Sequence, residues 1–189
     1  DNGPATIDTG DFATASITDD QIVVTASVPQ TFSFSLSANT DALGALSTGS
    51  VVSSPTPRVV TVGTNAKNGW YAWARDTNTG LNSASAAYTV ASTTPGSNST
   101  LSAGTEGYNM GVDSTNGTGT GTVSVDAAFN GAGAGQGGGL DTTLRTIASS
   151  NGTNNGATLT LTNNAAISNT TPAGTDYTDT ITVVGAGLF

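Results

Sequence analysis

The sequence predicts an all-β protein built as an antiparallel β-sandwich. Apolar and polar residues alternate in several short segments, as they do in strands with one buried face. Turn signals such as Asn-Gly and Pro-Gly recur about every ten residues, a spacing typical of sandwiches and barrels. No window has the 3.6-residue apolar period of an amphipathic helix, and no fixed-period repeat favours a solenoid.

The clearest alternation runs from Gln21 to Ser37 and is interrupted by Pro29. On both sides of the proline the even-numbered positions are apolar, at Ile22, Val24, Ala26, Val28, Phe32, Phe34 and Leu36. A proline has no N–H for a strand ladder, so it marks a break or an edge position. We expect two half-buried strands here in one shared register.

Further strands are expected wherever an alternating or β-branched segment lies between turn signals. In the 70–75 strand, the even-numbered residues should share one face and the odd-numbered residues the other. The glycine-rich segment 130–139 is expected to be a flexible loop. The expected strands are 42–50, 59–64, 70–75, 86–91, 108–112, 122–125, 141–149, 157–162, 165–168 and 177–184.

Composition excludes several classes of function. The chain has 189 residues, no Cys and no His, so thiol chemistry, zinc thiolate sites and the usual catalytic triad are excluded. The formal net charge is −9, which repels phosphate and disfavours both nucleic acid and anionic membrane surfaces as partners. Charged residues are only 9% of the chain, against about 25% in ordinary soluble proteins.

We expect a single sandwich domain over residues 21–189, preceded by an N-terminal extension over residues 1–20. The chain begins at Asp1, has no membrane-length apolar run and is rich in Ser, Thr and Asn, which favours a mature protein that is secreted to the extracellular space or the cell surface. Four sequons could carry glycans, at Asn98, Asn116, Asn151 and Asn169.

Candidate chemistry is sparse. The segment from Asp76 to Gly80 has the DxNxG start of a calcium loop but lacks its distant bidentate Glu, so a turn is the favoured interpretation. Asp176 and Asp179 are together a second weak candidate for calcium. Carboxylate pairs for glycoside hydrolysis lie mostly in turn sequences. We therefore predict no catalytic residue, no metal site and no cofactor. Tyr71 and Trp73 are candidate aromatics for a ligand face or a subunit interface.

Five short motifs lie along most of the chain: Val28-Pro-x-x-Phe32-x-Phe34-x-Leu36-x-x-Asn39, Leu46-Ser-x-Gly49, Thr64-Asn-Ala-x-x-Gly69-Trp70, Gly104-Thr-Glu-Gly-Tyr108 and Tyr177-Thr-Asp-Thr-Ile-Thr-Val183. Together they resemble secreted bacterial surface proteins. In general character the chain is similar to β-sandwich fibre subunits, namely the TasA and camelysin group, archaeal bundling pili and spore-coat-U-type pilins. This resemblance implies a jelly-roll or immunoglobulin/pilin-like sandwich that is completed by a strand from a neighbouring subunit.

The sequence thus leads us to expect a structural subunit of an extracellular filament, not an enzyme. Each subunit would donate its N-terminal segment to the next subunit in a head-to-tail homopolymer, by β-strand addition. The candidate donor residues are Ile7, Phe12, Thr14 and Ile17. The alternative is a monomeric surface module, either a carbohydrate-binding domain or part of a surface layer, with surface glycans as its partner.

Overall fold

The computed structural model describes residues 3, 10–15 and 21–189. Its regular structure is almost entirely β, with one short 3-10 helix, η1, at Ala127–Phe129. The strands are β1 (Phe32–Leu36), β2 (Val52–Ser53), β3 (Arg58–Thr64), β4 (Trp70–Arg75), β5 (Gly80–Ser83), β6 (Tyr88–Ala91), β7 (Asn98–Thr100), β8 (Gly107–Thr115), β9 (Val123–Val125), β10 (Gln136–Gly138), β11 (Arg145–Ser150), β12 (Asn154–Ala166) and β13 (Thr182–Gly187).

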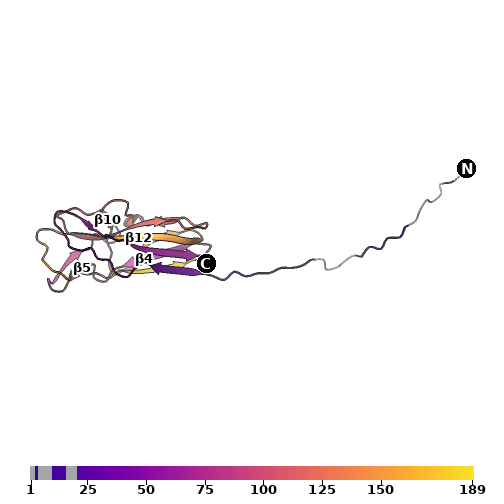
Figure 1. The fold of residues 1–189 in the computed structure, drawn as a ribbon, viewed down its shortest axis with the longest axis horizontal. Coiled ribbons are helices and arrows are strands. Elements are labelled where there is room, and N and C mark those ends of the chain that lie inside the picture. Colours follow the sequence, from indigo (N-terminus) through magenta and orange to yellow (C-terminus); the bar gives the residue numbers. More distant parts are fainter. Residues whose placement is uncertain (1–2, 4–9, 16–20) are drawn as a thin grey trace.

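Two antiparallel sheets face each other, which confirms the expected sandwich at the level of fold class (Figure 1). The larger sheet has the order β1-β3-β12-β8-β10-β7, with β2 also paired to β12. The smaller sheet has the order β13-β4-β11-β9. A separate two-stranded sheet, β5-β6, lies at the end of the sandwich away from the C-terminus (Figure 1).

Strand alternation builds the core as predicted. In β4, Trp70 and the two alanines that follow at alternate positions are fully buried, whereas Tyr71, Trp73 and Arg75 face outward. The indole Nε1–H of Trp70 donates to Asn154 Oδ1 at 2.9 Å, so the one polar atom of this buried ring has a partner. Valines of β3, leucines of β12 and Ile147 of β11 complete the core between the sheets.

Close approaches explain two of the glycines. Gly69 closes the β3–β4 connection at a φ of +86°, and a Cβ there would lie 1.8 Å from the carbonyl oxygen of Ser150. Gly185 lies under the ring of Phe34, where a Cβ would come within 2.4 Å of a ring carbon. Because Gly185 has no side chain, β13 at the edge of the smaller sheet can pack against Phe34 of β1, at the edge of the larger sheet.

The expected strand between Ile22 and Val28 is wrong for the single chain. Residues 21–31 form no strand, and the side chains of Ile22, Val24 and Val28 are 91%, 86% and 83% exposed. The chain first enters the sandwich at Phe32 and, before that, runs away from the body beside the C-terminus (Figure 1). The alternation in this segment therefore has no partner within the described part of its own chain.

Other predicted strands are shifted or merged. Segment 42–50 is a loop, and the strand expected over 177–184 starts instead at Thr182. The two strands expected over 157–168 are one strand, β12, in which Gly156 forms a bulge at a φ of +77° instead of a turn. The glycine-rich 130–139 segment contains β10, because its glycines let the backbone approach η1 and β8 closely.

Candidate functional site

A groove of about 410 Å³ opens where β1 ends and β13 begins. One side is lined by Leu36, residues 38–44 and Leu46, and the other by residues 177–181 and Val183. Leu81, Tyr108, Met110 and Leu161 also line it, so the groove lies between the main core and a smaller apolar cluster around Leu81 and Tyr108. Its lining is mixed, with leucines beside several polar and charged groups.

The groove and the N-terminal extension lie at opposite ends of the sandwich. Strand register establishes this, because Phe32 pairs with Thr64 at the end where the extension leaves, whereas Leu36 pairs with Val60 toward the other end. In the second sheet, Gly187 pairs with Trp70 at the extension end, and Thr182 pairs with Arg75 toward the groove end. The groove is therefore remote from the point where its own extension departs.

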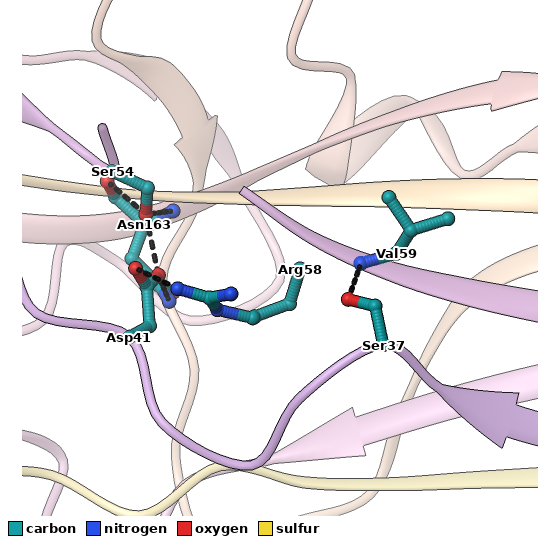
Figure 2. Close-up of polar contacts among 6 residues, drawn as sticks. All are labelled: Ser37, Asp41, Ser54, Arg58, Val59 and Asn163. Atoms are coloured by element: carbon teal, nitrogen blue, oxygen red, sulfur yellow. Dashed lines mark hydrogen bonds and ion pairs between the residues drawn. The ribbon is translucent and has the colours of Figure 1, made fainter. Parts of the chain in front are cut away.

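A polar network holds segment 38–57, which contains β2, against β12 and forms one wall of the groove (Figure 2). Oδ2 of Asp41 accepts from Ser54 Oγ at 2.5 Å and from Asn163 Nδ2 at 2.8 Å. Oδ1 of Asp41 lies 3.7 Å from a guanidinium nitrogen of Arg58. The backbone N–H of Ser54 also donates to the carbonyl of Asn163 at 2.8 Å, which fixes the loop to the strand.

Ser37 ends β1 beside this wall. Its hydroxyl accepts from the N–H of Val59 at 2.9 Å (Figure 2). Its own N–H donates to the carbonyl of Val59 at 2.8 Å. The serine side chain thus replaces the next ladder bond, after which the chain turns away from β3. This turn separates Leu36 from the loop and leaves room for the groove.

The other wall of the groove contains a buried carboxylate, that of Asp179. Burial raises the pKa of Asp179, and nearby backbone N–H groups oppose this shift only in part. Both carboxylate oxygens of Asp179 are buried without a partner in good hydrogen-bond geometry. Burial and the nearby charge of Asp179 raise the pKa of Asp76, which is 2% exposed. The phenol of Tyr108 is buried against the same acids, and this burial raises its pKa as well.

The calcium-like segment at Asp76 is a turn. Oδ1 of Asp76 accepts from the N–H of Thr79 at 3.2 Å, and Thr79 and Gly80 both have positive φ. Among the described residues, no group of three or more His, Cys, Asp and Glu side chains is placed to hold a metal ion.

Other carboxylates are occupied by local contacts. Asp141 pairs with Arg145 at 2.5 Å, and this hydrogen-bonded ion pair lowers the pKa of Asp141. Asp126 caps η1 by accepting from the N–H of Ala128 at 2.9 Å. Glu106 accepts from Tyr88, Ser168 and Thr171. These contacts tie turns to strands.

The structure describes two of the four candidate donor residues. Phe12 is 86% exposed and Thr14 is also exposed, while Ile7 and Ile17 lie outside the described residues. Neither described side chain packs on the sandwich. Their role as a donor strand stays a prediction.

Tyr71 and Trp73 lie next to each other on the outer face of the smaller sheet. Their rings stack with centroids 5.7 Å apart, and Tyr71 is 39% exposed. A hollow beside Tyr71 is lined by hydroxyl and amide side chains and by Leu188, the polar ones being Asn68, Thr122, Ser124, Ser149, Ser150 and Asn151. An aromatic ring beside hydroxyls and amides is compatible with either a sugar or a protein surface.

All four sequon asparagines are exposed. Three of them use their side chains in local hydrogen bonds: Asn98 Nδ2 donates to the carbonyl of Asn130, and Asn116 and Asn151 accept from backbone N–H groups. Glycosylation at these positions and at Asn169 stays a prediction.

Comparison with family models, curated proteins and solved structures gave no match to this chain. Among the described residues, none of the helical structure is long and apolar enough to cross a membrane.

Sequence reasoning missed most of the groove. It singled out Asp179 but not Asp41, Arg58 or Asn163, which come from a loop and two strands far apart in the chain. One signal could have pointed to this wall: Arg58 is one of only four basic residues, so a carboxylate partner for it was to be expected. A cation in so acidic a chain has many possible carboxylate partners, so its position alone did not indicate which one it would contact.

Proposed function

We propose that this chain is the structural subunit of an extracellular, pilus-like filament, and that it polymerises by donor-strand complementation through its N-terminal extension. The observation that carries the proposal concerns residues 21–31, which follow the N-terminal extension and lead to β1. They form no strand, and the side chains of Ile22, Val24 and Val28 are 83–91% exposed. A solvent-exposed run of this kind is costly unless another surface covers it.

The edges of the two sheets support edge-to-edge assembly. In the described chain the larger sheet ends in β1 and β7, and the smaller sheet ends in β13 and β9. None of these four strands contains a charged residue. Lys and other charges usually protect edge strands against pairing with a further strand. Edges without such protection suit a protein that pairs with its own copies.

The energy of strand addition is sufficient for a stable contact. Each main-chain hydrogen bond gives about 0.5–1.5 kcal/mol net, so a strand of about ten residues would supply several kcal/mol. Each apolar side chain that leaves water adds about 1.5–3 kcal/mol on full burial. Ordering the extension opposes this gain.

Electron microscopy of the purified chain tests the proposal. We expect filaments from the full chain and monodisperse particles from a truncation that lacks residues 1–30, because only the former carries a strand to donate. A second truncation, lacking residues 1–17, tests the candidate donor residues Ile7, Phe12, Thr14 and Ile17. Monodisperse particles from the full chain, across a range of concentration and ionic strength, would contradict self-assembly.

A second candidate function is a carbohydrate-binding surface module, favoured by the exposed stack of Tyr71 and Trp73 beside a polar hollow. Glycan-array binding by the chain that lacks residues 1–30, abolished by Trp73→Ala, would support it. No glycan binding by this monomer would remove it.

A further inference from the structure

Polar groups without a hydrogen bond in good geometry gather in the groove. In the described chain, eight buried side-chain nitrogen and oxygen atoms are of this kind, and five of them belong to four groove-lining residues. Weaker contacts are present, because Asp41 Oδ1 lies 3.7 Å from Arg58 and the phenol of Tyr108 and backbone N–H groups lie near Asp179. They are Asp41 Oδ1, Arg58 Nε, Asn163 Oδ1 and both carboxylate oxygens of Asp179. Native proteins leave few such atoms, so a local concentration of them needs an explanation.

The chemistry of these atoms restricts which kind of ligand would suit the groove. Four are acceptor oxygens and one is an N–H donor, and all five are buried, so a ligand that enters the groove and moves its walls apart should offer both donors and acceptors. The leucines beside them require apolar side chains. An extended peptide meets both needs, because its backbone offers N–H and C=O groups in alternation and its side chains point alternately into and out of a groove.

Charge selects one part of the extension. Residues 1–20 hold five of the 13 acidic residues and no basic one, whereas residues 21–30 hold no charge. The groove contains two carboxylates, of Asp41 and Asp179, against the single guanidinium of Arg58. It therefore disfavours an acidic strand and accepts a neutral one whose apolar residues recur at Ile22, Val24, Ala26 and Val28.

Asn65 holds residues 29–31, and with them the start of segment 21–28, at the end of the sandwich away from the groove of the same molecule. Its Nδ2 donates to the carbonyl of Pro29 at 2.8 Å, and its Oδ1 accepts from the N–H of Thr31 at 2.8 Å. These bonds hold the chain in line with β1 at the end of the sandwich opposite the groove. The occupant of the groove is thus better supplied by a second molecule.

We propose that the groove between Leu36–Leu46 and Tyr177–Val183 binds residues 21–28 of a second copy of this chain, with Ile22, Val24, Ala26 and Val28 turned inward. This inference rests on the proposed filament function and identifies which part of the extension enters which surface. Only residues 29–31, about 10 Å of extended chain, would then link the bound segment to its own sandwich. Successive subunits would be nearly in contact.

Engineered disulfides test the assignment directly, because the chain contains no cysteine. Val24→Cys in one preparation is mixed with Leu43→Cys in another, under oxidising conditions, so that only contacts between two copies can form the mixed dimer. We expect at least tenfold more mixed dimer than with Val24→Cys paired to Thr61→Cys, a control on the exposed face of β3, which is not an edge strand. The same excess is expected over Phe12→Cys paired to Leu43→Cys.

Electron microscopy of the same samples separates failure of this inference from failure of the filament. If filaments form and Val24→Cys bonds equally to Leu43→Cys and to Thr61→Cys, the groove is not the binding surface. If filaments form and only Phe12→Cys bonds to Leu43→Cys, the bound segment is not 21–28. In both cases the proposed function would stand. If a chain that carries both Val24→Cys and Leu43→Cys forms the disulfide only within one molecule, the claim that a second copy fills the groove would be overturned. Absence of any assembly from the full chain would overturn both proposals.

A charge placed inside the segment gives an independent test. Val24→Asp should raise the concentration needed for filaments at least tenfold, since the new carboxylate would enter an apolar and acidic groove. Thr25→Asp is the matched control, because its side chain points out of the groove and should leave that concentration within about twofold. Equal effects of the two variants would contradict the inward register. Neither residue packs on the sandwich, so the monomer fold is not at risk.

Discussion

Asn65 replaces a strand partner at the point where the ladder cannot continue. Pro29 has no N–H, so a further strand pairing through it would lose a bond. The amide of Asn65 instead both donates and accepts across Pro29 and Thr31, while the Asn65 N–H and the Thr64 hydroxyl donate to the carbonyl of Thr31. A single short side chain thus fixes the direction of the extension.

Asp179 and Asp76 give a test at the same scale. Asp179→Asn keeps the shape of the side chain and removes its charge, so the pKa of Asp76 should fall toward its ordinary value. NMR titration of the side-chain carboxyls measures this. Asp113→Asn, at an exposed site of β8, is the control and should leave the pKa of Asp76 unchanged. An unchanged pKa of Asp76 in Asp179→Asn would contradict the coupling.

The same substitution should alter the dependence of stability on pH. A carboxyl whose pKa is higher in the folded than in the unfolded chain binds its proton more tightly when folded. Stability then decreases as the pH rises from about 4, the unfolded value, through the folded pKa. Burial raises the pKa of both acids, so Asp179→Asn should lose less stability than the natural chain as the pH rises from about 4 to about 7. Denaturant unfolding at several pH values follows this difference.

Among the elements, β1 and β13 depend on one glycine. Gly185→Ala places a Cβ within 2.4 Å of the Phe34 ring, which must move away from the core it covers. We expect the free energy of unfolding to decrease by about 1–3 kcal/mol and the Tm, measured by calorimetry, to fall by several degrees. Gly49→Ala is the control, since its nearest neighbour would be the Ser47 hydroxyl at 3.7 Å. Equal Tm values for the two variants would show that β1 adapts freely.

Alternation predicted the paired strands but not the partner of each. The faces of β4 and the span of β3 were predictable, because burial on one side produces period two. The same pattern over Ile22–Val28 predicted a strand that the single chain does not form. Periodicity indicates that one face of a segment suits burial, but it does not show whether the folded chain buries that face.

Composition also misled at the glycine-rich segment and gave little of the groove. Gly137–Gly139 are buried because backbones pack against them, a cause that cannot be told from flexibility in sequence alone. The wall of Asp41, Arg58 and Asn163 joins residues more than 100 positions apart, which only the sheet topology brings together. Local signals such as turns and caps contain no trace of such contacts.

For the molecule as a whole, net charge should control the rate of assembly. Every copy carries a net charge of −9, of which −5 lies in residues 1–20, so approaching copies repel each other. Raising the salt concentration from about 10 to about 150 mM shortens the screening length from about 30 to about 8 Å, and we expect filament growth, followed by light scattering, to accelerate. Sucrose at equal osmolality is the control. Slower growth at high salt would show that attraction between opposite charges drives the encounter.

The extension and the groove lie at opposite ends of one rigid sandwich, and this has a consequence for any polymer that joins them. Each added molecule repeats the same orientation, so the polymer has a polarity, and its two tips are chemically different. One tip always displays an empty groove and the other a free neutral strand. Growth can then be stopped at one tip without affecting the other, and a cell could attach one tip to its surface while elongating from a single end.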